Sequence, residues 1–194
     1  MIDSIAIVIV LAASYFVGSI PTALIVSKKI KGIDIRSVGD GNMGARNTFH
    51  EIGRKYGITV AIIDFCKGIL PVLLAYVLSL NLGWQILAAV LTILGHDFPL
   101  FADFRGGQGL ATSLGTMQVL LPLPTIIGLT IYGVAFLVIK KSSISCAIGG
   151  AIIALILVVS QQWLLLVYVI IVFLFIPTKQ FIDSLHRKII GIAK

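Results

Sequence analysis

Charged side chains are scarce in this sequence. Only 12% of its 194 residues are Asp, Glu, Lys or Arg, 58% are hydrophobic, and the mean hydropathy is +1.08. Soluble proteins carry about 25% charged residues, so the composition excludes a soluble domain. Cysteine is scarce too. Cys66 and Cys146 both lie in apolar runs, which excludes a disulfide framework and leaves no metal-ligand spacing.

Apolar runs of membrane length recur along the chain instead. They predict an all-α integral membrane protein with seven transmembrane helices, forming a single domain over residues 1–194. The first run has no basic stretch before it and no clear cleavage site, so we expect it to be retained rather than removed as a signal peptide. The predicted spans are 3–27, 57–80, 84–101, 107–121, 123–139, 143–159 and 162–177.

The net charge of +7 is distributed unevenly. Apart from Lys67, every Lys and Arg lies in connections that fall on one side of seven alternating spans. The positive-inside rule makes that side cytoplasmic, with the N-terminus outside and the C-terminus inside. This distribution explains the basic pI without a nucleic-acid partner.

The longest connection, residues 28–56, contains the polar cluster Gly39-Asp-Gly-Asn-Met-Gly-Ala-Arg-Asn47. Glycines at this spacing allow positive φ angles and close approach to a ligand, and successive amides in such a loop can bind an anion. An ordinary turn is the commoner alternative. Residues 45–52 predict a short helix closed by Gly53. Arg36 and Arg46 flank the cluster, where they can contact a ligand or lipid phosphates.

A second cluster begins as Gly95-His-Asp-Phe-Pro99 and continues as Phe104-Arg-Gly-Gly-Gln-Gly-Leu-Ala-Thr112, just before the fourth span. A glycine-rich turn at a helix N-terminus offers free amides and the positive end of the helix dipole, so with Arg105 beside it we predict a phosphate cradle. Close helix packing through small residues is the alternative. The sequence is neither a Walker A loop nor a dinucleotide fingerprint.

Four other polar residues stand out. Asp64 and Lys67 are three residues apart inside the second span, which predicts a buried ion pair, with phosphate binding by Lys67 as the alternative. His96 is either a structural hydrogen bonder or a base. Ser143 is either part of a helix cap or another hydroxyl donor to the same anion.

Seven motifs follow one another along the first two thirds of the chain. They are Gly18-Ser-Ile-Pro21, Asp34-Ile-Arg36, Gly39-x-Gly-Asn-x-Gly-Ala-x-Asn47, Gly53-x-Lys-x-Gly57, Asp64-x-x-Lys-Gly68, Gly95-His-x-Phe-Pro99 and Phe104-x-Gly-Gly-x-Gly-x-Ala-Thr112. In order and spacing, they resemble the PlsY family of bacterial acylphosphate-dependent glycerol-3-phosphate acyltransferases. The resemblance implies an inner-membrane enzyme of phospholipid biosynthesis whose site faces the cytoplasm. It would transfer a fatty acyl group from acyl phosphate to the 1-hydroxyl of glycerol 3-phosphate, giving lysophosphatidate and phosphate. It implies no cofactor, no metal and no obligatory protein partner.

Together with the loop chemistry, the resemblance assigns roles to individual residues. Asn42, Arg46 and His96 are the expected catalytic residues. The attacking hydroxyl would pass its proton to a substrate phosphate oxygen or to His96. The acyl chain would lie between helices, open to the membrane. The expected substrate-binding residues are Arg36, Gly39, Asp40, Gly41, Gly44, Asn47, Lys67, Arg105, Gly106, Gly107, Gly109, Thr112 and Ser143.

The sequence departs from the family pattern at the expected site. Asp40 stands where a serine is usual, Arg46 where a threonine is, His50 where an arginine is, and Gln108 where a lysine is. Asp40 adds negative charge that Arg46 can offset. The family's third motif, Arg-His-x-x-Asn-Ile, has no counterpart in register within residues 176–182.

Two other functions therefore remain open. One is a paralogue that binds a phosphorylated lipid or polyol without turnover, or that uses another acceptor. The other is a small-anion transporter, against which the clustering of polar residues on one side of the membrane argues.

Overall fold

The computed structural model describes residues 4–189, with side chains described to residue 185. Over that range the protein is helical, and six helical segments are long and apolar enough to cross a membrane. The predicted fold class, an all-α integral membrane protein, is confirmed. The helices are α1 (Ser4–Gly18), α2 (Thr22–Lys31), α3 (Ala45–Glu51), α4 (Arg54–Val77), α5 (Leu82–Asp97), α6 (Leu110–Leu120), α7 (Pro122–Ile139), α8 (Ser142–Val159) and α9 (Trp163–Ile189), with short 3-10 turns η1 (Ile35–Ser37) and η2 (Leu100–Ala102).

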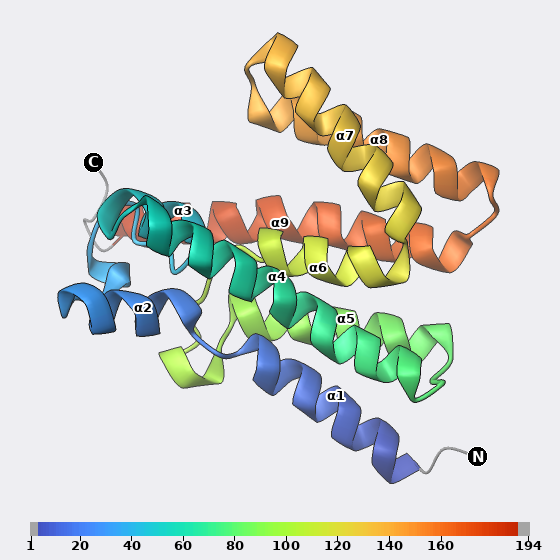
Figure 1. Cartoon of the computed structure of the whole chain (residues 1–194), viewed down its shortest axis with the longest axis horizontal. Helices are drawn as coiled ribbons and strands as arrows, with labels where there is room; N and C mark the ends of the chain where they lie inside the picture. The colour runs from blue at the N-terminus through green and yellow to red at the C-terminus, as the bar shows by residue number, and fades with distance from the viewer. Residues whose placement is uncertain (1–3, 190–194) are drawn as a thin grey trace.

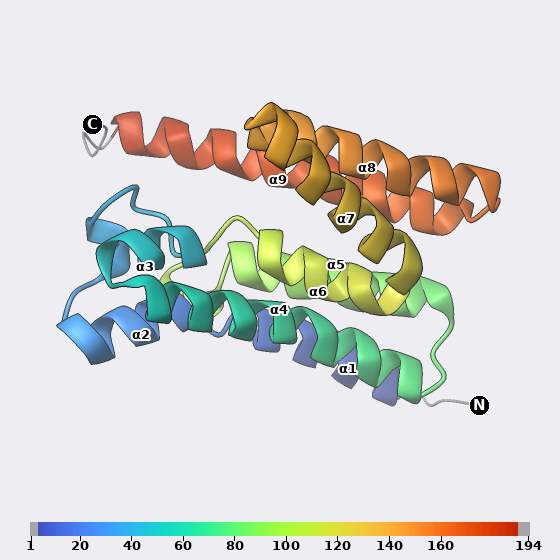
Figure 2. The ribbon, with the colours of Figure 1, turned by 45° about the horizontal axis from the view of Figure 1, so that its top comes forward.

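Helix α4 packs on α1, α5 and α6 (Figure 1). In Figure 2, α5 and α6 lie between α1 and α4 on one side and α8 and α9 on the other. Side chains from α4, α5, α6, α8 and α9 form the largest buried apolar cluster, which includes Val72, Ile93, Met117, Leu157 and Tyr168. The first turn of α1 and the last turn of α9 lie at opposite ends of the bundle (Figure 1).

The first predicted span, 3–27, is interrupted in the structure. Helix α1 ends at Gly18 and α2 begins at Thr22, because Pro21 has no amide hydrogen to continue the helix. Two carbonyls at this break accept hydrogen bonds from the buried Lys67 ammonium, that of Ile20 at 2.8 Å and that of Gly18 at 3.4 Å. The prediction of one continuous helix here is therefore wrong, and α2 extends beyond it to Lys31.

The fourth and seventh predicted spans also differ in length from the helices observed. Helix α6 has 11 residues, so it spans about 16 Å, roughly half the hydrocarbon core of a bilayer. It begins only at Leu110 because Gly109, directly before it, has a left-handed backbone with φ +68°, which a right-handed helix does not contain. The amides of Gly106 and Gly107 before it donate to carbonyls at the end of α5. Helix α9 continues past the predicted end at 177 to Ile189, with Pro177 inside it.

Close contacts between backbones hold α5 and α6 in place. A Cβ on Gly95 would overlap the carbonyl oxygen of Tyr15 in α1, and a Cβ on Gly68 would overlap that of Thr112 in α6. Small residues at such crossings let membrane helices approach closely. These crossings fix the C-terminal end of α5 and the N-terminal end of α6, between which the second polar cluster lies.

The long connection, residues 28–56, is ordered and has an apolar core of its own. Ile35 and Met43 are buried with Leu24 of α2, Val60 of α4 and Ala102 of η2. The short helix predicted at 45–52 is present as α3, and Gly53 follows it with a φ of +140°. This small core joins the first polar cluster to the second.

Candidate functional site

The two glycine-rich clusters lie at the same end of the bundle, near α2 and α3 in Figure 1. We call residues 38–47 the first loop and residues 97–109 the second loop.

Asn47 organises the first loop. Its side-chain amide nitrogen lies within hydrogen-bond distance of three carbonyls, those of Ile35, Val38 and Asn42, at 3.0, 3.0 and 3.1 Å. Its side-chain oxygen accepts the amide of Asp40 at 3.2 Å. Only 2% of Asn47 is exposed, so this side chain holds the loop in shape from inside. Both polar atoms of the side chain are thus bonded within the loop, and a role of Asn47 as a substrate ligand stays a prediction.

The first loop uses its glycines in two ways. Gly39 and Gly41 have positive φ angles, +61° and +68°, as expected for a loop that approaches a ligand closely. Gly44 is extended, with φ −131°, and precedes α3. Asn42 donates its backbone amide to the Asp40 carboxylate, and its buried side-chain oxygen has no partner among the described residues. Asn42 is therefore the residue of this loop best placed to take a new hydrogen bond.

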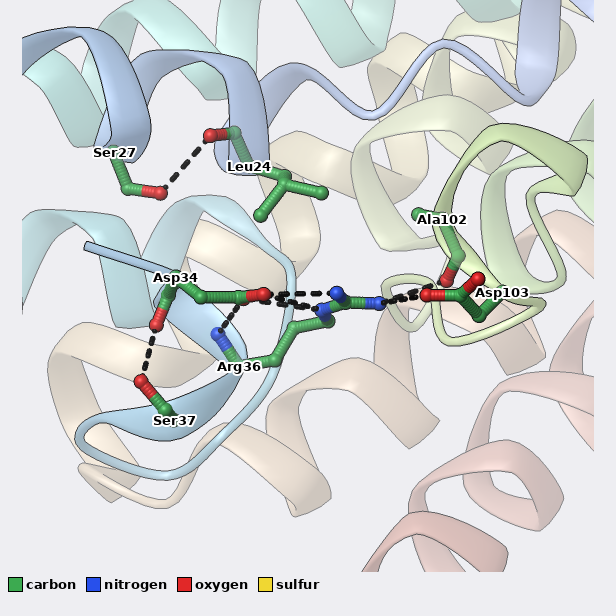
Figure 3. Close-up of polar contacts among 7 residues, drawn as sticks. All are labelled: Leu24, Ser27, Asp34, Arg36, Ser37, Ala102 and Asp103. Atoms are coloured by element: carbon green, nitrogen blue, oxygen red, sulfur yellow. Dashed lines mark hydrogen bonds and ion pairs between the residues drawn. The ribbon is translucent and has the colours of Figure 1, made fainter. Parts of the chain in front are cut away.

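Arg36 joins the two loops (Figure 3). Its guanidinium forms an ion pair with Asp34 at 2.8 Å and, on the other side, contacts the Ala102 carbonyl at 2.9 Å and the Asp103 carboxylate at 3.3 Å. The hydrogen bonds and charge of Arg36 hold the pKa of Asp34 below its usual range, and Asp34 raises the pKa of Arg36. Both groups are therefore charged near neutral pH.

The second loop is built differently from the predicted cradle. The amide of Gly106 donates to the Asp97 carbonyl and that of Gly107 to the His96 carbonyl, so neither is free for an anion. Asp97 is fully buried, and neither carboxylate oxygen has a hydrogen-bond partner among the described residues. A Cβ on Gly109 would lie 2.9 Å from one of these oxygens. The protein's own carboxylate therefore lies beside the N-terminal end of α6, which the helix dipole favours.

Two further features of this region bear on binding. The hydroxyls of Thr112 and Ser113 are buried without a hydrogen-bond partner among the described residues. Arg105 is exposed, and its guanidinium has no partner in the part of the chain that the structure describes. Arg105 is thus an exposed positive charge within the second loop, and no described residue neutralises it.

Asp64, Lys67 and His96 form a buried cluster. The predicted ion pair between Asp64 and Lys67 is present, at 2.9 Å. The Lys67 ammonium lies 3.5 Å from Nδ1 of His96, and the Asp64 carboxylate lies 3.9 Å from the same nitrogen. His96 is only 6% exposed, and a Cβ on Gly107 would overlap its Nε2. The structure thus supports a structural role for His96 and Lys67 more than direct contact with substrate.

Arg46 lies on a different face from Asn47. With His50 it lines an open groove of about 340 Å³ between α3 and α4, whose other walls include Phe49, Ile58 and Ala61. The groove is apolar apart from these two side chains. Its walls therefore suit a hydrocarbon chain, and Arg46 is exposed beside them.

Three other positions complete the comparison with the sequence. Ser143 is exposed in the first turn of α8, whose main contacts are with α7 and α9, and its role as a hydroxyl donor stays a prediction. Sequence reasoning gave no role to Asp97 or to Lys179 of α9. Lys179 is buried, pairs with Asp183, and lies 5.1 Å from the ring centre of Phe98. In the sequence, the only indication of a role for Asp97 and Lys179 is that both lie near the ends of apolar spans.

Comparison with known proteins agrees with this architecture. The family model described as glycerol-3-phosphate acyltransferase matches residues 8–188. A relative from Listeria monocytogenes with that name is 37% identical over 165 residues, covering 84% of this chain and 83% of its own. Glycerol-3-phosphate acyltransferase 4 of Dehalococcoides mccartyi is 46% identical over 122 residues, 63% of this chain, but the match spans only 53% of that relative's length.

A solved structure has the same fold. The crystal structure of PlsY, an integral membrane glycerol 3-phosphate acyltransferase, in its glycerol 3-phosphate form superposes with a TM-score of 0.81 and 29% identity. The match covers 96% of this chain and 93% of that one. The lysophosphatidic acid form of that protein gives 0.78. The resemblance expected from the motifs is confirmed: this chain belongs to the glycerol-3-phosphate acyltransferase family.

Proposed function

We propose that this protein transfers a fatty acyl group from an acyl phosphate to the 1-hydroxyl of glycerol 3-phosphate, giving lysophosphatidate and phosphate. The observation that supports this most is the family match over residues 8–188, whose motifs form the two linked loops. The solved relative is named for the same acceptor and for the corresponding product.

The chemistry suits a site made of cations and amides. The hydroxyl oxygen attacks the acyl carbon, the bond from that carbon to the phosphate oxygen breaks, and phosphate leaves with the electron pair. Because acyl phosphate is already activated, the enzyme needs no covalent nucleophile, and positioning with charge stabilisation can supply most of the rate. His96 is buried against Gly107, which favours a substrate phosphate oxygen as the acceptor of the hydroxyl proton.

Two exposed arginines would bind the two phosphates. Arg105, exposed and without a partner among the described residues, would bind glycerol 3-phosphate through its planar guanidinium. Arg46 would hold the phosphate of the donor beside the groove between α3 and α4, with the acyl chain along Ile58 and Ala61 toward the bilayer. Asn42 lies in the first loop, just before α3, and would contact the reacting groups.

The site would face the cytoplasm of a bacterium, with the helices in its inner membrane. The basic connections at the site end of the bundle support this orientation through the positive-inside rule. Both substrates would then reach the site from the cytoplasmic side, the acceptor from solution and the donor from the membrane.

A paralogue that binds a phosphorylated lipid or polyol, or that uses another acceptor, is the second candidate. The exposed carboxylate of Asp40 in the first loop favours it, because a negative charge beside the proposed site repels phosphate.

The test is turnover by the purified protein in lipid, supplied with palmitoyl phosphate and glycerol 3-phosphate. The proposal expects phosphate and lysophosphatidate in equal amounts. Phosphate without lysophosphatidate would indicate hydrolysis or another acceptor. No release by folded protein would favour a binding protein.

A further inference from the structure

The contact between Arg36 and η2 spans 66 residues of sequence. On one side of the guanidinium, Nε and Nη2 donate to the Asp34 carboxylate, at 3.0 and 2.8 Å. On the other side, Nη1 donates to the Ala102 carbonyl and the Asp103 carboxylate. Figure 3 shows the guanidinium extended between the two groups. The planar fork of arginine suits this bridge, because it offers donors in opposite directions.

The segment that Arg36 holds is a strained turn. Asp103 and Phe104, neither of them glycine, have φ angles of +55° and +57°. Such a conformation persists only where the surroundings impose it. The side chain of Phe104 is 55% exposed and so contributes little burial. The amide of Phe104 donates to the Pro99 carbonyl and that of Arg105 to the Ala102 carbonyl, which closes the turn. Arg36 binds the corner of this turn, residues 102–103.

This turn leads directly into the second loop. Arg105 follows Phe104, and the two glycines after Arg105 are bonded to the end of α5. Ala102 is itself buried in the core of the first connection, beside Ile35 and Met43. The corner held by Arg36 therefore sets where Arg105 lies relative to the first loop.

Arg36 differs in kind from the cations that are free to bind phosphate. Its side chain is 20% exposed and contacts two carboxylates, whereas Arg46 and Arg105 are exposed. A phosphate on Arg36 would have to displace Asp34 or break the link to η2. We infer that Arg36 is a positioning residue: it fixes the second loop, and with it Arg105, against the first loop, and it does not bind substrate phosphate itself.

The first experiment needs no substrate. Amide hydrogen exchange over residues 100–109 is measured for the ligand-free protein in lipid, in the parent, in Arg36→Gln and in Arg54→Gln. Arg54 is the matched control, because it is an exposed arginine near the same connection with no partner among the described residues. We expect exchange over 100–109 to accelerate about tenfold or more in Arg36→Gln, and to stay unchanged in Arg54→Gln. Unchanged exchange in Arg36→Gln would overturn the inference.

The second experiment rests on the proposed function and separates positioning from binding. Asp34→Asn removes the carboxylate that orients Arg36 and keeps the side-chain volume. If Arg36 positions the loop, the KM for glycerol 3-phosphate rises in Asp34→Asn as it does in Arg36→Gln, and Arg36→Lys does not restore it, since an ammonium lacks the fork. If Arg36 bound phosphate, releasing it from Asp34 would lower the KM, and that result would overturn the inference.

The two proposals fail separately. A parent protein without turnover would refute the acyltransferase proposal, while the exchange data would still decide the role of Arg36. Should Arg36→Gln not fold, the exchange of Asp34→Asn over residues 100–109 takes its place, with the same expected acceleration and the same overturning result.

Discussion

Lys67 donates a hydrogen bond of 2.8 Å to the carbonyl of Ile20, at the break between α1 and α2. Its ammonium also pairs with Asp64 one turn away on α4. A carbonyl freed by a helix break inside a membrane costs several kcal/mol unless it is satisfied. The pair that the sequence places inside the second span thus also stabilises the interruption of the first.

Breaking this pair on one side should destabilise the protein strongly. Lys67→Met leaves a buried carboxylate without its cation and removes a donor from the carbonyls of Gly18 and Ile20, and we expect a loss of about 3–5 kcal/mol in the free energy of unfolding. The double variant Asp64→Leu/Lys67→Met removes the uncompensated charge and should unfold at a higher temperature than Lys67→Met, though below the parent. Thermal unfolding in lipid measures both. A double variant less stable than Lys67→Met would contradict this account.

A second pair of variants tests how much the close crossing of α4 and α6 limits side-chain size at Gly68. Gly68→Ala places a Cβ against the backbone of Thr112 and should cost about 1–3 kcal/mol of stability, because two helix backbones must separate. Gly133→Ala in α7 is the control. A Cβ there meets no atom within 4 Å, so its melting temperature should be unchanged or slightly higher. Equal losses of stability in both variants would show that the close helix crossing is not the reason why position 68 needs a glycine.

The sequence predicted the membrane class and most helix positions because bilayer length and apolar composition act over whole segments. The sequence did not predict helix ends that depend on contacts with residues distant along the chain. The break before Pro21 is stabilised by Lys67, which is distant in sequence. The late start of α6 follows from the left-handed backbone of Gly109. The loop before it is held by the amides of Gly106 and Gly107, bonded to the end of α5, and nothing local in the sequence specifies those partners.

For the site, residue types were predicted better than residue roles. Glycine, asparagine and arginine in the two clusters indicated loops with special backbones, and the positive φ angles of Gly39, Gly41 and Gly109 agree with this. Whether a polar side chain faces a ligand or its own loop depends on contacts across the fold. Asn47 faces its own loop, and Arg36 bridges to a carbonyl 66 residues away.

Asn47 yields a prediction of its own. Asn47→Asp replaces the amide donor with a carboxylate facing the carbonyls of Ile35, Val38 and Asn42, so the first loop should lose its shape. Misplacement of about 1 Å can cost on the order of 100-fold in rate, and we expect a loss of that size in kcat/KM. Amide exchange over residues 38–47 should rise in parallel. A kinetic loss with unchanged exchange would indicate direct contact with substrate instead.

The pair of Asp34 and Arg36 predicts a dependence on pH. Since the pKa of Asp34 is lowered in the folded protein, its contribution to stability is fully present above its unfolded value, about 3.9, and is lost as the pH falls through the folded pKa. The difference in melting temperature between the parent and Asp34→Asn should therefore stay constant from about pH 8 to 5 and shrink below about pH 4. A difference that already shrinks between pH 7 and 5 would show that Asp34 is not held as a carboxylate by Arg36.

Arg105 is the variant that most directly tests phosphate binding. Its side chain is exposed and has no partner among the described residues, so Arg105→Gln should leave the melting temperature unchanged. The KM for glycerol 3-phosphate should rise about tenfold or more, because a charge-assisted hydrogen bond contributes about 1.5–3 kcal/mol. Gly107→Ala is no substitute for this test, since its Cβ would press on His96 and disturb the buried cluster. An unchanged KM in Arg105→Gln would mean that the acceptor phosphate binds elsewhere. The next variant to measure would then be Arg46→Gln, because Arg46 is exposed beside the groove between α3 and α4.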